Sequence, residues 1–248
     1  MDIMSLLRKK DKTPVCSAVI VAAGSSQRMG SDKILMKLGP MPVLVRTILA
    51  FQDSPLVDEI IVVTRMEKIE EIAKLCNDSG LSKVKMVISG GATRMESCLA
   101  GVSAVKKSAK LIAIHDGARP LVSQDVISRT VYAAQKYKSA VPVISSTDTL
   151  KSIDADGVIV GSVDRTSTVR VQTPQVFDAD LIKGALTKAV KDGLSITDDC
   201  SAMEMMGVKT HTVDGDRDNI KITTPGDAVI AEAIIRDRGD YYANRAWV

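Results

Sequence analysis

The sequence is poor in aromatic residues and in histidine. Only 3% of its 248 residues are Phe, Trp or Tyr, and its two histidines are His115 and His211. Proteins that bind single-stranded nucleic acid stack the bases on aromatic side chains, so this scarcity argues against that class. The formal net charge of +3 is also too small to indicate a nucleic-acid partner by itself. We therefore expect no nucleic-acid partner.

The four cysteines lie far apart and form no Cys-x-x-Cys pair; they are Cys16, Cys76, Cys98 and Cys200. Together with only two histidines, they give little support for a zinc site. Such cysteines are typical of reduced thiols in the cytoplasm. Cys98 and Cys200 fall in helical patterns, so we expect them to be small core residues.

The chain also lacks a run of about 18 apolar residues, the length that a membrane-spanning helix requires. Residues 1–14 form a polar lead-in with several basic residues but without the apolar core and cleavage site of an export signal. We therefore expect a cytoplasmic protein with no membrane association. Hydrophobic residues make up 45% of the chain and charged residues 25%, which suits a globular domain with a substantial core.

Short apolar runs alternate with amphipathic segments in the first part of the chain. The expected strands cover residues 17–22, 59–63, 85–88, 111–114 and 139–144. Between them, Pro42 and Ser123 mark helix starts, as do two capping-box sequences, Thr64 to Glu67 and Thr93 to Glu96. This alternation predicts an α/β fold, a Rossmann-like and mostly parallel twisted sheet flanked by helices, with right-handed crossovers.

The alternation breaks between about residues 145 and 173. Two short β-like runs there flank Asp154-Ala155-Asp156-Gly157, which is typical of a hairpin turn. The segment has few large apolar residues, and we expect a projecting β-arm that is used for dimerisation. The remaining expected elements are helices at 179–190 and 197–206, a strand at 209–213 and a last helix that begins at Thr224-Pro225. We expect a single domain over residues 15–236 and a tail over 237–248.

The first expected strand runs into a loop of small residues, Ala22 to Ser26, and Arg28 and Lys33 follow. Small side chains let the backbone approach a ligand, and a row of exposed N–H groups can hold phosphate oxygens. Two cations beside such a loop suit a polyphosphate. The loop has neither the Gly-Lys-Ser/Thr of a P-loop nor a Gly-x-Gly-x-x-Gly dinucleotide motif. Because an ordinary Gly/Ser turn has the same composition, this loop alone does not decide between the two interpretations.

Two further loops combine small and charged residues. Gly90-Gly91 precedes the second capping box, which puts Arg94 at the first helical position, where a guanidinium and free N–H groups together favour an anion. The fourth strand runs into the segment 115–120, which places Asp116 at the carboxyl end of a strand, where open parallel sheets bind ligands. A solvated first-turn arginine and an ordinary Asp-Gly turn are the alternatives.

In their order along the chain, these motifs resemble those of the 2-C-methyl-D-erythritol 4-phosphate cytidylyltransferases, nucleotidyltransferases of the non-mevalonate isoprenoid pathway. The resemblance covers nearly everything from Ser17 to Ile235. It rests on a combination of motifs that is far more specific than any one of them. The motifs are Ala22-Ala23-Gly24, Arg28-Met29-Gly30, Gly90-Gly91 with Arg94 and Ser97, His115-Asp116-Gly117-Ala118-Arg119-Pro120, Asp148-Thr149, Val163-Asp164-Arg165, Thr173-Pro174-Gln175, Thr197-Asp198-Asp199 and Asp218-Asn219-Ile220-Lys221.

The resemblance implies transfer of CMP from CTP to the phosphate of a sugar-alcohol phosphate, with release of pyrophosphate. The attacking phosphate oxygen is already an anion, so the reaction needs no general base. Catalysis is then mainly positioning and the stabilisation of charge by cations. Mg²⁺ is the implied cofactor, bound to the triphosphate near Asp116, and the implied assembly is a homodimer that exchanges its arms.

The resemblance also implies roles for single residues. Arg28 and Lys33 would stabilise the transition state at the α-phosphate. Lys221 and Arg165 would position the substrate phosphate, with Arg165 coming from the arm of the other subunit. The implied nucleotide-binding residues are Ala22, Ala23, Gly24, Gly91, Arg94 and Ser97. The implied residues for the methylerythritol phosphate are Asp116, Arg119, Thr149 and Thr173.

Some positions depart from the family pattern. The loop after Arg28 is short, which leaves Lys33 and Lys37 as candidates for one lysine, and counting back from Leu38-Gly39 favours Lys33. Ala92 stands where many members have an acidic residue, and Asp199 stands where the family often has Glu.

Two other functions remain open at this point. A ribitol 5-phosphate cytidylyltransferase would share the nucleotide chemistry and differ only in the polyol. A non-catalytic nucleotide-binding regulator would not require the cations Arg28, Lys33, Arg165 and Lys221 together.

Overall fold

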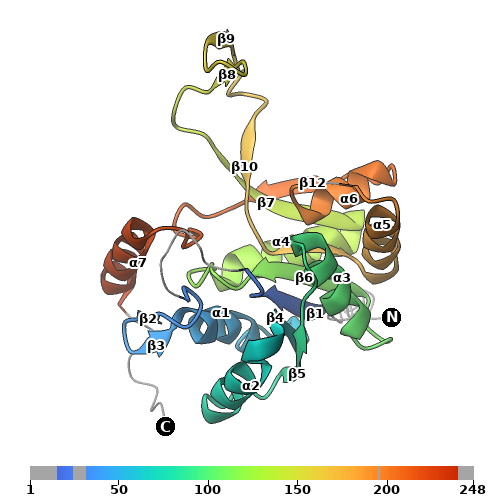
Figure 1. The fold of residues 1–248 in the computed structure, drawn as a ribbon, viewed down its shortest axis with the longest axis vertical. Coiled ribbons are helices and arrows are strands. Elements are labelled where there is room, and N and C mark those ends of the chain that lie inside the picture. Colours follow the sequence, from blue (N-terminus) through green and yellow to red (C-terminus); the bar gives the residue numbers. More distant parts are fainter. Residues whose placement is uncertain (1–15, 25–31, 195, 240–248) are drawn as a thin grey trace, which may run out of the picture.

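The computed structural model describes residues 16–24, 32–194 and 196–239. An eight-stranded sheet forms its centre, and helices cover both faces (Figure 1). The strands lie in the order β10-β7-β11-β6-β1-β4-β5, and β12 also pairs with β7. These strands are β1 (Cys16–Val21), β4 (Val57–Thr64), β5 (Val84–Ser89), β6 (Leu111–Asp116), β7 (Ser139–Ser145), β10 (Val169–Val171), β11 (Gln175–Asp178) and β12 (His211–Asp214).

The sheet is mostly parallel, as the alternation of strands and helices predicted. β1 pairs in parallel with both β4 and β6, and β5 extends the parallel part beyond β4. Two antiparallel neighbours were not predicted. β10 pairs with β7, and β11 lies between β6 and β7 and runs antiparallel to both. Its four residues, Gln175–Asp178, are too few to give a pattern that sequence analysis recognises.

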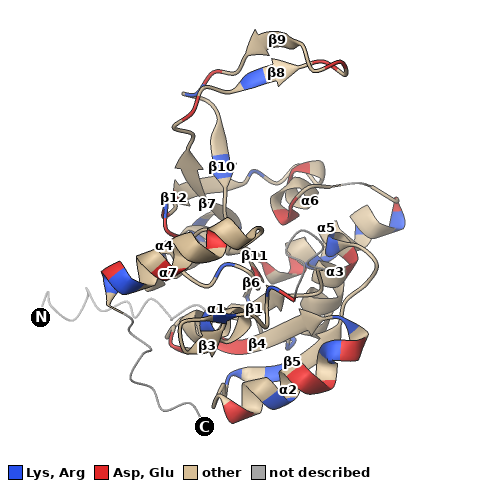
Figure 2. Ribbon diagram, turned by 60° about the vertical axis from the view of Figure 1, so that its left-hand side comes forward, with Lys and Arg blue, Asp and Glu red and all other residues tan. Residues whose placement is uncertain are grey.

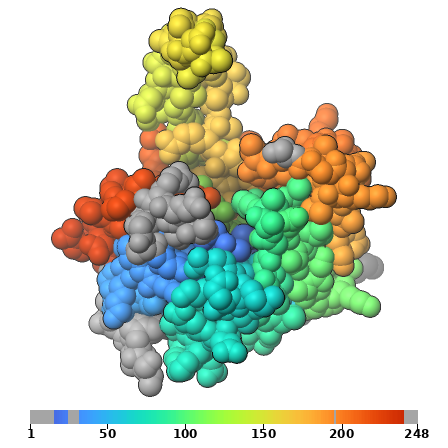
Figure 3. All heavy atoms as spheres, in the orientation of Figure 1, coloured from blue at the N-terminus to red at the C-terminus, as the bar shows by residue number. Residues whose placement is uncertain are grey.

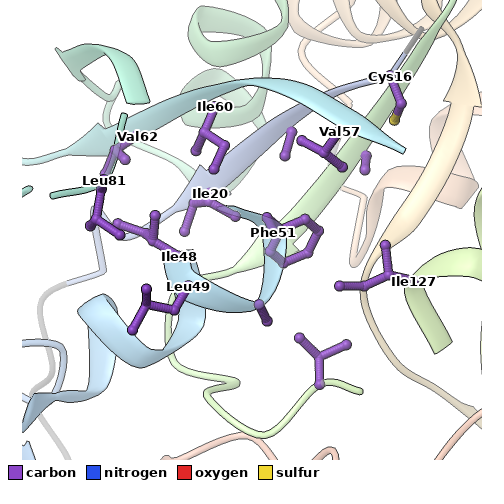
Figure 4. Packing of buried hydrophobic residues seen from close by; sticks show 14 of the residues in the cluster. Cys16, Ile20, Ile48, Leu49, Phe51, Val57, Ile60, Val62, Leu81 and Ile127 are labelled. Carbon is purple, nitrogen blue, oxygen red and sulfur yellow. The ribbon is translucent and has the colours of Figure 1, made fainter. Parts of the chain in front are cut away.

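Two apolar layers hold the helices against the sheet, because side chains of one strand alternate between its faces. On β1, Ile20 belongs to the layer under α1, α2 and α4, whereas Val19 belongs to the layer under α3, α5 and α6. Figure 4 shows the first layer, where Ile48 and Phe51 of α1 lie beside Ile20 of β1. The helices are α1 (Val43–Gln52), α2 (Ile69–Asp78), α3 (Arg94–Ala104), α4 (Gln124–Tyr137), α5 (Ala179–Lys191), α6 (Asp199–Met205) and α7 (Pro225–Arg238).

Three of the predicted helix caps are confirmed. The side chains of Thr93, Ser123 and Thr224 each accept a hydrogen bond from a backbone N–H in the first turn of the helix that follows. The predicted capping box at Thr64 is wrong, because Thr64 is the last, fully buried residue of β4. A 3-10 turn (Met66–Lys68) follows, and α2 begins only at Ile69.

The segment after β7 leaves the body of the molecule as an arm (Figures 1 and 3). It contains a separate two-stranded antiparallel sheet, β8 (Lys151–Ile153) with β9 (Ile159–Ser162), so the hairpin predicted around 154–157 is confirmed. Asp154 accepts hydrogen bonds from the backbone N–H groups of Asp156 and Val158 and thereby closes the turn.

The arm carries more apolar surface than its composition suggested. Ile153, Val158, Ile159 and Val160 have between 58% and 63% of their surface exposed. Apolar side chains gathered at this exposure are typical of a contact surface.

The four cysteines are free thiols and all are buried, as expected for Cys98 and Cys200. None of the helices in the described part of the chain combines the length and apolar character needed to cross a bilayer.

Candidate active site

A cleft of about 360 Å³ opens at the carboxyl ends of β1 and β6, a size in the range of small-molecule sites. The N-terminal turn of α3 and the loop before it form one wall, and Lys221 reaches the cleft from near the end of the chain. The cleft brings together nine of the predicted site residues. They are Ala22, Ala23, Gly24, Lys33, Gly91, Arg94, Ser97, Asp116 and Lys221.

Close packing requires a glycine at position 90, beside the cleft. The N–H of Ala22 donates to the carbonyl of Val63, 2.7 Å away, and the N–H of Gly90 donates to the carbonyl of Thr64 at the same distance. A Cβ atom on Gly90 would lie 2.5 Å from the Ser97 hydroxyl. A larger side chain there would therefore displace the loop that carries Gly91.

Ser97 holds that loop to α3. Its hydroxyl donates to the carbonyl of Thr93 at 2.9 Å and accepts from the N–H of Gly91 at 3.2 Å. Both contacts are within the protein, so Ser97 fixes the shape of the wall that a nucleotide would meet.

Lys33 is positioned by the residue before it. The side chain of Asp32 forms an ion pair with Arg65, which follows β4, and the carbonyl of Asp32 accepts from the N–H groups of Leu35 and Met36. Lys33 lines the cleft, whereas Lys37 lies in the short strand β2 (Lys37–Leu38), which pairs with β3 (Met41–Pro42), and is exposed. Sequence analysis did not find the Asp32–Arg65 pair. Arg28 lies outside the described residues.

Asp116 is the charged centre of the cleft floor. Its Oδ2 lies 2.9 Å from Nζ of Lys221 and 3.5 Å from Nε of Arg119, and its Oδ1 lies 3.5 Å from Arg94. Burial alone would raise the pKa of this carboxyl, but the three cations, Lys221 first, outweigh burial and hold the pKa well below its usual range. Asp116 is therefore an anion at any pH at which the protein works.

Two buried groups fix Asp116 from behind. The Thr173 hydroxyl accepts from the N–H of Asp116 at 3.2 Å and lies 3.0 Å from Nδ1 of His115. Burial lowers the pKa of His115 to about 4, so the ring is neutral, and its Nε2 lies 3.1 Å from the carbonyl of Arg119. The ring thus accepts from Thr173 through Nδ1 and donates through Nε2.

Asn219 completes this support, and sequence analysis assigned it no role. Its side-chain N–H donates to the carbonyl of Thr173 at 2.8 Å, and its own carbonyl accepts from Arg119 at 2.7 Å. Through these two hydrogen bonds, Asn219 holds the loop that carries Lys221 against the floor of the cleft.

Arg94 lies in the cleft wall but is bound to another part of the protein. Its guanidinium donates two hydrogen bonds to the carboxylate of Asp199, the first residue of α6, at 2.9 and 2.8 Å. This contact gives the unexplained Asp199 a structural role. Arg94 remains a predicted nucleotide ligand, because about a third of its side chain stays exposed.

Asp199→Asn should lower the free energy of unfolding by about 2 kcal/mol, because the half-buried guanidinium of Arg94 would lose the nearer of its two counter-charges and keep only the more distant Asp116. Urea unfolding measures this change. Asp199→Glu, which keeps the charge, should recover most of the loss. The surface variant Asp192→Asn, which breaks an exposed pair with Lys188, should change stability by less than about 0.5 kcal/mol. A loss for Asp199→Asn no larger than that of Asp192→Asn would contradict the assignment.

Two predicted site residues lie far from this cleft. Thr149 and Arg165 are exposed residues of the arm, and the Arg165 guanidinium lies 3.4 Å from the carbonyl of Thr147, also in the arm. Thr173 and Arg119 support Asp116 from below and beside it, as described above. Of the predicted site residues that the structure describes, nine line the cleft, Arg119 and Thr173 lie against Asp116, and the two on the arm lie apart.

Comparison with known proteins shows the family to which the chain belongs. Residues 16–237 match the family model of 2-C-methyl-D-erythritol 4-phosphate cytidylyltransferase. The enzyme of that name from Caldanaerobacter subterraneus is 42% identical over 227 residues, which cover 89% of this chain and 98% of that protein. The one from Symbiobacterium thermophilum is 39% identical and covers 89% and 93%.

Two solved structures share the fold. The 4-diphosphocytidyl-2C-methyl-D-erythritol synthase of Anaerococcus prevotii superposes with a TM-score of 0.80 at 32% identity and covers 90% of this chain and 97% of that one. The Thermus thermophilus 2-C-methyl-D-erythritol 4-phosphate cytidylyltransferase gives a TM-score of 0.72 at 31% identity, with 89% and 98% covered. From the family match, the sequence identities and the shared fold together, we conclude that the chain belongs to the 2-C-methyl-D-erythritol 4-phosphate cytidylyltransferase family.

Proposed function

We propose that the protein transfers CMP from CTP to 2-C-methyl-D-erythritol 4-phosphate, which yields 4-diphosphocytidyl-2-C-methyl-D-erythritol and pyrophosphate. The reaction serves the formation of isoprenoid precursors. The observation that carries the proposal is the cleft itself, in which a small-residue loop, two lysines and an ionised carboxylate meet in a chain of this family.

The transfer of CMP requires cations in the active site more than it requires a general base. An oxygen of the acceptor phosphate attacks the α-phosphorus of CTP, the new P–O bond forms, and the bond to the β-phosphate oxygen breaks to release pyrophosphate. Both partners are anions, so their repulsion is the main obstacle. Lys33 lines the cleft on the side of the small-residue loop, and Lys221 lines it at Asp116. We infer that Lys33 and Arg28 stabilise the α-phosphate and that Lys221 holds the acceptor phosphate.

Asp116 fits a magnesium ion. Mg²⁺ is commonly held by one or two carboxylates together with substrate phosphates, and Asp116 offers an ionised carboxylate at the cleft floor. When bound, the ion would neutralise part of the charge on the triphosphate.

We infer that two chains build each site. The arm of one chain lies away from its own cleft (Figure 3) and carries Arg165 and Thr149. It also exposes Ile153, Ile159 and Val160, which a neighbouring chain would cover. The arm of a partner in a twofold dimer would bring Arg165 and Thr149 to the acceptor.

The direct test measures pyrophosphate release from CTP with each of two acceptors. We expect kcat/KM for 2-C-methyl-D-erythritol 4-phosphate to exceed that for ribitol 5-phosphate about a hundredfold, because the two polyols differ in length and branching. The opposite order would identify a ribitol phosphate enzyme. Binding of CTP without release of pyrophosphate from either acceptor would identify a non-catalytic regulator.

A further inference from the structure

A second hollow, of about 290 Å³, lies at the foot of the arm next to the cleft. Lys221 lines both, so the two spaces meet at its side chain. Three arginines complete the basic lining of the hollow: Arg119 after β6, Arg170 in β10 and Arg217 after β12. In Figure 2, β10 carries its basic residue where the arm joins the body.

The protein neutralises only part of this charge, since Asp116 pairs with Lys221 and Arg119 but with neither of the other two arginines. Asp227, the carboxylate in the lining, accepts hydrogen bonds from the backbone N–H groups of Thr223 and Thr224 and from the Thr223 hydroxyl, all in the cap of α7. Neither Arg170 nor Arg217 forms an ion pair with any carboxylate in the described part of the chain.

The carboxylates on either side of Arg217 are bound elsewhere. Asp216 and Asp218 both face Arg238 of α7, at 3.2 and 2.7 Å. Arg119 is buried, and its guanidinium N–H groups point to Asp116 and to the carbonyl of Asn219. Burial and the positive charge of Arg170 both lower the pKa of Arg119, although Asp116 opposes them. The hollow therefore combines strong positive charge with unpaired guanidinium groups.

This charge suits a phosphate monoester. A guanidinium presents two parallel N–H donors to phosphate oxygens, a match that ammonium groups do not offer. The acceptor phosphate must reach Lys221 to attack the nucleotide, and Lys221 stands where the hollow meets the cleft. A phosphate on Lys221 can thus face the α-phosphorus on one side and the two arginines on the other.

We propose that Arg170 and Arg217 bind the phosphoryl group of the acceptor substrate where the hollow meets the cleft. The inference rests on the proposed function, since it assigns the hollow to that reaction's acceptor. Neither arginine belongs to the motifs that carry the family resemblance, so both add to the acceptor-binding residues assigned above.

The test compares the double variant Arg170→Gln/Arg217→Gln with the wild type and with Arg236→Gln, an exposed arginine of α7. We expect the KM for 2-C-methyl-D-erythritol 4-phosphate to rise about tenfold in the double variant. The KM for CTP should stay within about twofold, since only the acceptor loses contacts. The Arg236→Gln variant should have the KM values of the wild type for both the acceptor and CTP. An unchanged acceptor KM, or an equal rise in both KM values, would overturn the proposal.

A second experiment distinguishes binding of the acceptor phosphate from binding of the pyrophosphate that leaves, because both are phosphate anions. Inorganic phosphate should compete with the acceptor in the wild type and lose that effect in the double variant. Weaker inhibition by pyrophosphate in the double variant, with an unchanged acceptor KM, would assign the hollow to the leaving group and overturn the proposal.

Calorimetric titration of the wild type and the double variant with inorganic phosphate, without CTP, separates this inference from the proposed function. Phosphate binding that the double variant loses supports the hollow as an anion site whether or not CMP transfer occurs. Binding that the two proteins share overturns the inference even if the wild type is an active cytidylyltransferase.

Discussion

Lys33→Ala should lower kcat about a hundredfold while CTP binds almost as tightly as before, because charge accumulates at the α-phosphorus mainly in the transition state. The loss corresponds to about 3 kcal/mol of transition-state stabilisation. Lys33 lines the cleft beside the small-residue loop, where the triphosphate is expected. Steady-state kinetics with both substrates, together with CTP titration of the variant, separates the two effects.

Lys37→Ala is the matched control for this experiment. Lys37 lies four residues on, in β2, and is exposed outside the cleft lining. We expect its alanine variant to keep nearly wild-type kcat. If the Lys37→Ala enzyme were inactive and the Lys33→Ala enzyme were active, Lys37 and not Lys33 would be the lysine of the family motif.

Two inactive variants, Lys33→Ala and Arg165→Ala, should restore activity when they are mixed and allowed to exchange subunits. Within one chain, Lys33 lines the cleft and Arg165 lies in the arm that projects from the body. If each site takes its cleft from one chain and its arm from the other, a mixed dimer has one site with both lesions and one with neither. Random exchange makes about half the dimers mixed, so activity should recover to roughly a quarter of the wild-type value.

The control is a mixture of Lys33→Ala with Arg28→Ala, two lesions expected on the same side of the site. Every dimer in that mixture would have a lesion in both sites, and no activity should return. If subunit exchange is demonstrated by mass and the first mixture also stays inactive, each chain builds its site alone.

Local patterns predicted most of the fold, and the one wrong capping box shows their limit. The sequences at Thr64 and Thr93 have the same form, with Glu three residues later. Thr93 follows a glycine turn and caps α3 through its side chain. Thr64 instead continues an apolar strand, and its burial in β4 keeps the backbone extended. A buried strand overrides a capping preference worth about 1 kcal/mol.

The site was predictable where residues near in sequence act together, and less so where distant segments meet. Glycine and alanine loops after strands marked the cleft without any knowledge of tertiary contacts. The pairing of Arg94 with Asp199, by contrast, joins residues 105 positions apart. The contact of Asn219 with Thr173 spans 46 positions. No periodicity or spacing encodes such pairs, so the support of Asp116 and the pairing of Arg94 with Asp199 came only from the structure.

The place of β11 in the sheet sets the order in which the protein can be completed as it is synthesised. A ribosome delivers the N-terminal part first, and β1, β4, β5 and β6 pair only with one another up to that stage. β7 cannot join these strands until β11 has been translated, because β11 lies between β7 and β6. Lys221 comes later still and reaches back to Asp116. The strands that carry the small-residue loop and Asp116 are therefore made first, and the ion pair between Lys221 and Asp116 can form only after most of the chain has been synthesised.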